Sequence, residues 1–157
     1  MNEIEISVTG NVCSEVSQHD YAGGRFTRFS VACTPRLFKE GRWSDGPTSF
    51  FRVGCFGNLG ANVFASVHKG DPVLVRGRVT VRNWESDGVT RTSVDINADS
   101  VGHDLRFGGA VFQRARREAA STDDAPWSAV PAELAQEGRD AGLSADRVQA
   151  DAAGVAG

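Results

Sequence analysis

Long apolar runs are missing from this sequence: no stretch reaches about 18 residues, the length that a membrane-spanning helix needs. The first residues, Met1–Glu5, lack the basic and apolar stretches of a secretion signal. Only three of the 157 residues are cysteine, with no CxxC spacing and no nearby histidine pair, so we expect no zinc site. These absences favour a cytoplasmic protein without metal or cofactor.

Catalytic sets are missing as well. No Ser/His/Asp set, carboxylate pair or glycine-rich phosphate loop occurs at a readable spacing, so we predict no enzyme. In a reducing cytosol the cysteines should be free thiols, with Cys33 and Cys55 at core-facing positions of candidate strands. Cys13 follows the first strand, and the odd number of thiols leaves open a disulfide between subunits through Cys13.

The formal net charge of −3 is unevenly distributed along the chain. Residues 1–104 carry 11 Lys+Arg and 12 Asp+Glu, and residues 105–117 carry four arginines and no acid. Residues 118–157 carry two arginines and eight acids. The negative charge is therefore concentrated in the tail, and the arginines before it remain compatible with a polyanionic partner.

Alternating apolar and polar residues predict five strands and one short helix. The helix is expected over Leu59–Val67, with Asn58 as N-cap, and Pro35–Pro47 is interpreted as a loop. The order β-β-β-α-β-β is that of the OB-fold, so we predict an all-β, five-stranded Greek-key barrel with the helix between strands 3 and 4. The first expected strand runs from Ile4 to Gly10. The other four cover Arg25–Thr34, Thr48–Phe56, Pro72–Trp84 and Val89–Ala98.

The composition changes towards the end of the chain. We expect a binding domain over residues 1–112, in which Leu105–Phe112 forms an added strand or a hook onto a neighbouring subunit. Residues 113–157 are rich in Ala, Gly, Ser and Asp and poor in large apolar side chains. Such a segment cannot bury enough apolar surface to fold, so we predict a largely disordered tail.

Aromatic and arginine residues recur at every second position of two expected strands, and so share one face of each. The opposite face of the second strand, from Val73 to Val81, is aliphatic and predicts the core side. Flat rings stack on unpaired bases and guanidinium groups neutralise phosphates, so this face suits single-stranded nucleic acid. The residues are Phe50, Arg52 and Phe56 on the first strand and Arg76, Arg78, Arg82 and Trp84 on the second.

Each of these residues also has an ordinary structural interpretation. Phe50 and Phe56 could be core rings, but they share a face with Arg52, and a charged residue is rarely buried unpaired. Trp84 could cover the rim of the core, and the arginines could solvate an exposed strand. Trp43, in the loop, could stack on a base or pack locally.

Six blocks of sequence, in continuous order across residues 1–112, resemble bacterial single-stranded DNA-binding proteins of the homotetrameric OB-fold family. The last block and the residues after it are similar to the actinobacterial branch in particular. This family is itself the usual example of base stacking on single strands. The blocks are Ile6–Val12, Phe29–Ala32, Phe50–Gly60, Lys69–Gly77, Arg82–Trp84, and Ala98–Gly102 followed by Leu105–Phe107.

The resemblance implies base-stacking aromatics at Phe50, Phe56 and Trp84, with Phe50 in place of the family's usual tryptophan. A fourth aromatic position falls on Leu37, and the adjacent Phe38 is expected to substitute for it. Phosphate contacts are expected from the arginines of the same face and of nearby segments, namely Arg52, Arg76, Arg78, Arg82, Arg28 and Arg36.

The resemblance also implies a homotetramer. Its interfaces would use apolar residues of the first strand and of the hook, namely Ile4, Ile6, Val8, Leu105 and Phe107. The family's tail normally closes with an acidic tip ending in Pro-Phe, which docks on partner enzymes, whereas this chain ends in Ala153–Gly157. We therefore expect a paralogue without that tip, and whether it has protein partners stays open.

Together these observations predict sequence-independent binding and protection of single-stranded DNA in replication, recombination or repair, in the cytoplasm at the nucleoid. Two alternatives stay open. An RNA-binding OB module would use the same rings and would prefer oligo-U to oligo-dT. A primosomal OB-fold protein would bind mainly another protein and would show weak strand binding with little salt dependence.

Overall fold

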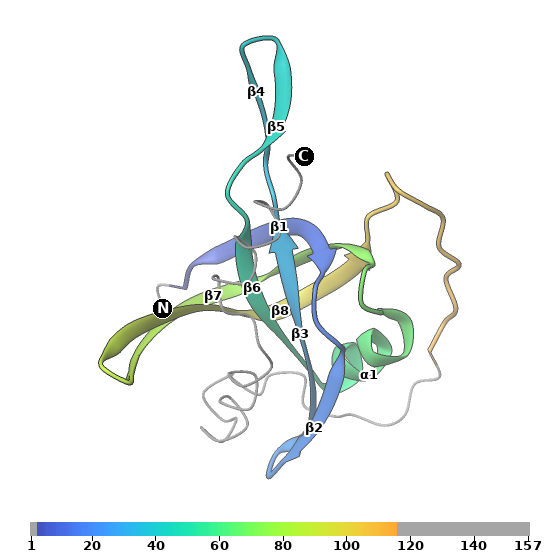
Figure 1. Ribbon diagram of the computed structural model, residues 1–157. Helices are drawn as coiled ribbons and strands as arrows, with labels where there is room; N and C mark the ends of the chain where they lie inside the picture. The colour runs from blue at the N-terminus through green and yellow to red at the C-terminus, as the bar shows by residue number, and fades with distance from the viewer. Residues whose placement is uncertain (1–2, 116–157) are drawn as a thin grey trace. The chain divides into compact units, whose positions relative to one another are not determined.

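The computed structural model describes residues 3–115 (Figure 1). These residues form a mostly β structure with one helix, as expected. The strands are β1 (Glu5–Val12), β2 (Ser17–Tyr21), β3 (Gly24–Cys33), β4 (Arg36–Lys39), β5 (Arg42–Asp45), β6 (Ser49–Phe56), β7 (Pro72–Ser86) and β8 (Val89–His103), with the helix α1 (Gly57–Ser66) between β6 and β7.

Six strands form one sheet in the order β1-β7-β8-β6-β3-β2. Neighbouring strands in this sheet are antiparallel, except for β6 and β8, which run parallel to each other. The end of β1 also pairs with β3, through Asn11 opposite Ala32 and Val12 opposite Val31, so the sheet curls back on itself. This closure gives the small barrel that the element order predicts.

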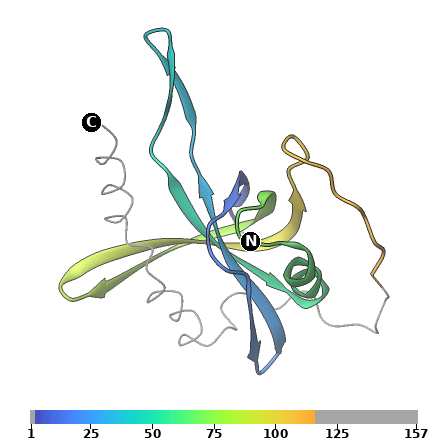
Figure 2. The same ribbon diagram turned by 45° about the vertical axis from the view of Figure 1, so that its right-hand side comes forward.

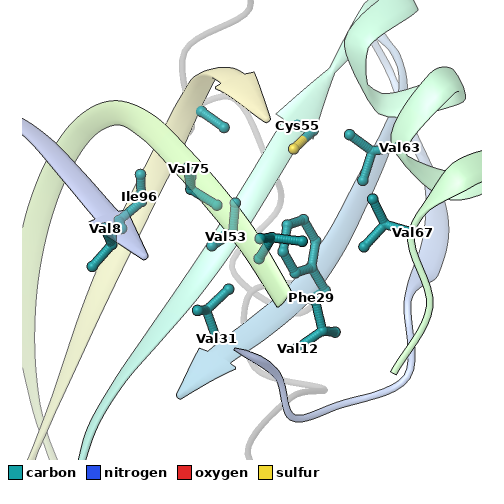
Figure 3. Packing of buried hydrophobic residues seen from close by; sticks show 12 residues of the cluster. Val8, Val12, Phe29, Val31, Val53, Cys55, Val63, Val67, Val75 and Ile96 are labelled. Carbon is teal, nitrogen blue, oxygen red and sulfur yellow. The ribbon is translucent and has the colours of Figure 1, made fainter. Parts of the chain in front are cut away.

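The interior of the barrel is filled by aliphatic side chains from alternate positions of the strands (Figure 3). From α1 and the residue after it, Val63 and Val67 pack against this cluster. Cys55 lies inside the cluster and burial raises the pKa of its thiol to about 12, whereas Cys33 packs at its margin. The buried members include Val8, Val12, Phe29, Val31, Val53, Val73, Val75 and Ile96.

The hairpin of β7 and β8 continues past the barrel as an arm (Figures 1 and 2). Gly77 marks the register shift between the two strands, where any Cβ would collide with the carbonyl oxygen of Asn97. Val79, two positions beyond Gly77, still packs against the core opposite Ile96, and the core-facing side of β7 ends there. The expectation that the core face extends to Val81 is therefore wrong, since Val81 is 58% exposed.

Two other expectations need correction. Pro35–Pro47 is no plain loop, because β4 and β5 form a second hairpin arm (Figures 1 and 2). The helix begins at Gly57 with Phe56 as its N-cap residue and no side-chain cap, so Asn58 does not cap it. Of the two alternatives for Leu105–Phe112, the segment contains no strand, and the hook onto a neighbouring subunit stays a prediction.

Candidate nucleic-acid interface

The register of β6, β8 and β7 brings one set of side chains onto the same side of the sheet, away from the core. Arg52 lies opposite Asp95, and Arg82 lies opposite Ser93. Residues directly opposite each other in a sheet point to the same face. We call this side the outer face, formed by Phe50, Arg52, Ser93, Asp95, Arg82 and Trp84.

A charge cluster occupies the middle of the outer face. The Arg52 guanidinium donates from Nε to Asp95 Oδ1 (2.6 Å) and from Nη2 to Asp95 Oδ2 (2.9 Å). Arg52 Nη2 also donates to Ser93 Oγ (2.8 Å), and Arg82 Nε lies 3.3 Å from Asp95 Oδ2. The carboxylate of Asp95 is only 2% exposed, so one buried negative charge faces two guanidinium groups.

Two of the predicted stacking residues lie beside this cluster. Phe50 precedes Arg52 by two positions on β6 and is 36% exposed. Trp84 follows Arg82 by two positions on β7 and is half-buried. Each ring is therefore on the same face as an arginine, as the alternation predicted.

Phe56 does not share this environment. Its ring stacks on Phe26 with the centroids 5.6 Å apart, Tyr21 meets it edge-on at 5.9 Å, and it is only 4% exposed. The hairpin of β2 and β3 supplies both covering rings. The expectation that Phe56 is an exposed stacking ring is wrong for this chain, because a base cannot reach its face without displacing Phe26 or Tyr21.

The arm of β4 and β5 carries a further aromatic pair. Phe38 lies opposite Trp43, with the ring centroids 5.1 Å apart, and both rings are well exposed. An open hollow beside Trp43 is lined by Lys39, Glu40, Arg42 and Ser44. The arm therefore combines planar and cationic groups outside the barrel.

Three of the four remaining predicted arginines are engaged with carboxylates. Arg76 Nη2 donates to Glu5 Oε2 (3.0 Å), which together with the general attraction of this carboxylate raises the pKa of Arg76. Arg78 makes longer ion pairs with Glu3 and Asp99, both at 3.5 Å. Arg36 pairs with Asp45 at 3.2 Å. Such exposed pairs stabilise a fold little. Arg28 is half-buried on β3, opposite Ser17 of β2.

The predicted subunit contacts fall into two groups. Ile4, Leu105 and Phe107 are exposed. Val8 belongs to the core and points into the barrel opposite Val75, so it does not line an interface as expected. Ile6 packs against the core but is only partly buried, and its place in an interface stays a prediction. Within residues 3–115, the edge of β1 that faces away from β7 has a partner strand only at its end, through the β3 pairing.

Cys13 is half-buried and its thiol is free. Burial raises the pKa of this thiol, so less of it is the reactive thiolate at neutral pH. The disulfide between subunits stays a prediction. Residues 3–115 contain neither a metal-binding group of three acidic, histidine or cysteine side chains nor a helix long and apolar enough to cross a membrane. The predicted tail lies almost wholly outside the described residues.

Sequence reasoning missed Asp95 and Ser93. They alternate with Val94 and Ile96, which gives a polar and an apolar face, but alternation alone does not show which strand lies beside β8. The parallel pairing of β6 with β8 brings Asp95 to Arg52, 43 positions away. No local pattern carries that information.

Comparison with known proteins shows the family of this chain. The sequence model of the single-strand binding protein family matches residues 1–104. The chain belongs to the single-strand binding protein family. A curated relative from the family, "Single-stranded DNA-binding protein 1" of Streptomyces coelicolor, is 43% identical over 124 residues, covering 78% of this chain and 80% of the relative.

Solved structures of this family have the same fold. The crystal structure of a small single-stranded DNA-binding protein from Streptomyces coelicolor matches with a TM-score of 0.65 and 44% identity, covering 69% of this chain and all of that one. The second single-stranded DNA-binding protein of Mycobacterium smegmatis matches with a TM-score of 0.56 and 26% identity, covering 72% and 100%. The resemblance to the actinobacterial branch and the predicted all-β OB-fold are confirmed.

Proposed function

We propose that this protein binds single-stranded DNA without sequence preference, by base stacking and by arginine–phosphate contacts. The observation that carries the proposal is the outer face of a family member, where Phe50 lies two positions from Arg52 and Trp84 two positions from Arg82. Each stacked base contributes about 1–3 kcal/mol, judged by alanine substitution, and every base has a face to stack. Such binding depends little on sequence.

The arm of β4 and β5 extends the binding surface. Phe38 and Trp43 offer two exposed rings, and Arg36 lies at the base of the same arm. A phosphate can replace the carboxylate partners of Arg36, Arg76 and Arg78, because exposed ion pairs hold together only weakly. Releasing counterions from the DNA then adds a favourable contribution that falls as salt rises.

A homotetramer accounts for the exposed apolar residues outside the outer face. The open edge of β1 can pair with a second copy, with Ile4 beside it, and Leu105 and Phe107 can pack on a neighbouring subunit. Several outer faces in one assembly would bind one strand together, so each further contact forms at high effective concentration.

The protein is not an enzyme, since its family consists of binding proteins. Its proposed task is to cover and protect exposed single strands during replication, recombination or repair. With this ligand, the proposed site of action is the nucleoid in the cytoplasm.

Titration of the full chain with oligo-dT, followed by tryptophan fluorescence at several salt concentrations, tests the proposal. We expect quenching and an affinity that falls steeply with salt, with a slope of about −0.7 for each phosphate neutralised. Absence of quenching, or an affinity independent of salt, would exclude this mode of binding. An oligo-U titration at matched salt is the control, and tighter binding to oligo-U would favour an RNA-binding role.

A further inference from the structure

Asp95 is an acidic residue in the middle of a surface that must attract phosphates. It is nearly fully buried, whereas the carboxylates paired with Arg36, Arg76 and Arg78 are largely exposed. A buried carboxylate is costly unless strong hydrogen bonds compensate for the lost water. A buried carboxylate at this position therefore calls for a structural or functional reason.

The contacts of Asp95 join three strands. Its two oxygens accept from two nitrogen atoms of Arg52 on β6, and Oδ2 also lies 3.3 Å from Nε of Arg82 on β7. Ser93 adds a hydroxyl contact to the same Arg52 nitrogen that bonds Oδ2. A side-on, two-point pair fixes the plane of a guanidinium, which one contact cannot do.

We infer that Asp95 is a positioning residue for DNA binding: it holds Arg52 and Arg82 together, in fixed orientation, on the face that also carries Phe50 and Trp84. This inference rests on the proposed function. Two guanidinium groups would otherwise repel each other, and each would lose side-chain freedom when DNA binds. With Asp95 in place that ordering is complete before the strand arrives, and the cluster keeps a net charge of +1.

The direction in which Asp95→Asn changes the affinity for DNA separates a positioning role from a simple effect of charge. Asp95→Asn keeps the shape of the side chain and raises the positive charge of the outer face by one. If charge alone mattered, DNA would bind more tightly and the salt slope would steepen. Positioning predicts the reverse: affinity for oligo-dT falls about tenfold or more, the effect of losing one charge-assisted hydrogen bond, and the slope becomes shallower by about 0.7.

Asp99→Asn is the matched control. It makes the same change of charge on β8. Asp99, however, is half-exposed, and its contact with Arg78 is long, at 3.5 Å. We expect Asp99→Asn to bind oligo-dT as tightly as the wild type or more tightly. A folded Asp95→Asn variant that behaves like Asp99→Asn overturns the inference, and so does a variant that loses stability but keeps its affinity and slope.

Arg52→Lys provides a second test if Asp95→Asn does not fold. Lysine keeps the charge but cannot form the two-point pair with Asp95. Positioning predicts weaker binding, whereas unchanged affinity and slope would overturn the inference. Wild-type protein is titrated in parallel: if it fails to bind oligo-dT, the proposed function is wrong, and if it binds while both variants bind equally well, only the role of Asp95 is wrong.

Discussion

Two phenylalanines on the same side of β6 have opposite environments. Phe50, near the start of the strand, keeps about a third of its surface exposed, whereas Phe56, at the end, is enclosed by Phe26 and Tyr21. The two rings therefore serve different purposes: Phe50 is available to a base, and Phe56 stabilises the junction between the sheet and the β2–β3 hairpin.

Alanine substitutions distinguish the two purposes. We expect Phe56→Ala to lower the free energy of unfolding by about 3–5 kcal/mol, the usual cost of deleting a buried ring. Phe50→Ala should leave stability nearly unchanged and weaken oligo-dT binding by about 1–3 kcal/mol. Chemical denaturation and fluorescence titration of both variants measure these effects. A stable Phe56→Ala variant with lost DNA binding would contradict the assignment.

Alternation along β6 could predict which residues share a face, and it did so for Phe50, Arg52 and Phe56. It could not predict burial. The argument that a charged neighbour implies exposure fails because Arg52 is itself largely enclosed, at 18% exposure, and paired with Asp95. Both the partner of Arg52 and the cover over Phe56 come from other strands, so they depend on tertiary pairing.

At the scale of elements, Asp71 ties together the entry to β7 and the end of β8. Its Oδ2 accepts from the His68 backbone N–H (2.8 Å) and lies 3.3 Å from His103 Nε2. Burial by itself would raise the pKa of Asp71, but the contacts with His68 and His103 outweigh burial and lower it. The ionised carboxylate is thus the form that the folded protein favours.

A lowered pKa makes stability depend on pH in a definite direction. The contribution of Asp71 is complete above the ordinary carboxyl value of 3.8 and is lost as pH falls through the lower value of the folded state. We expect Asp71→Asn to melt at a lower temperature than the wild type near neutral pH, and the difference to close in strong acid. A difference in melting temperature that stays constant across this range would contradict the role of the charge.

The β4–β5 arm shows why some elements escape prediction. All eight residues of its strands are exposed, so neither strand has the alternating apolar face by which strands are recognised. Its turn, Glu40-Gly41, has positive φ at both positions, which is common for glycine but not for glutamate. The helix and five of the six strands of the main sheet bury apolar residues and were predictable, whereas the polar β2, which has no fully buried residue, was not.

At the scale of the whole molecule, the open edge of β1 and the exposed apolar residues point to assembly. We expect the wild type to have the mass of a tetramer in size-exclusion chromatography with light scattering. Ile4→Asp should shift the mass towards smaller species without loss of fold, because Ile4 is exposed within one chain. Val81→Asp, which charges another exposed aliphatic side chain, on the β7–β8 arm, is the control and should keep the wild-type mass.

The Asp95 cluster also has a consequence for synthesis. Arg52 and Asp95 are separated by 43 positions, and the carboxylate comes from the last strand of the barrel. Contacts between such distant segments form late, because the intervening chain must first lose much of its freedom. A nascent chain on the ribosome therefore completes the Arg52–Asp95–Arg82 cluster only after β8 has emerged. Translation products that end before β8 lack this part of the binding surface.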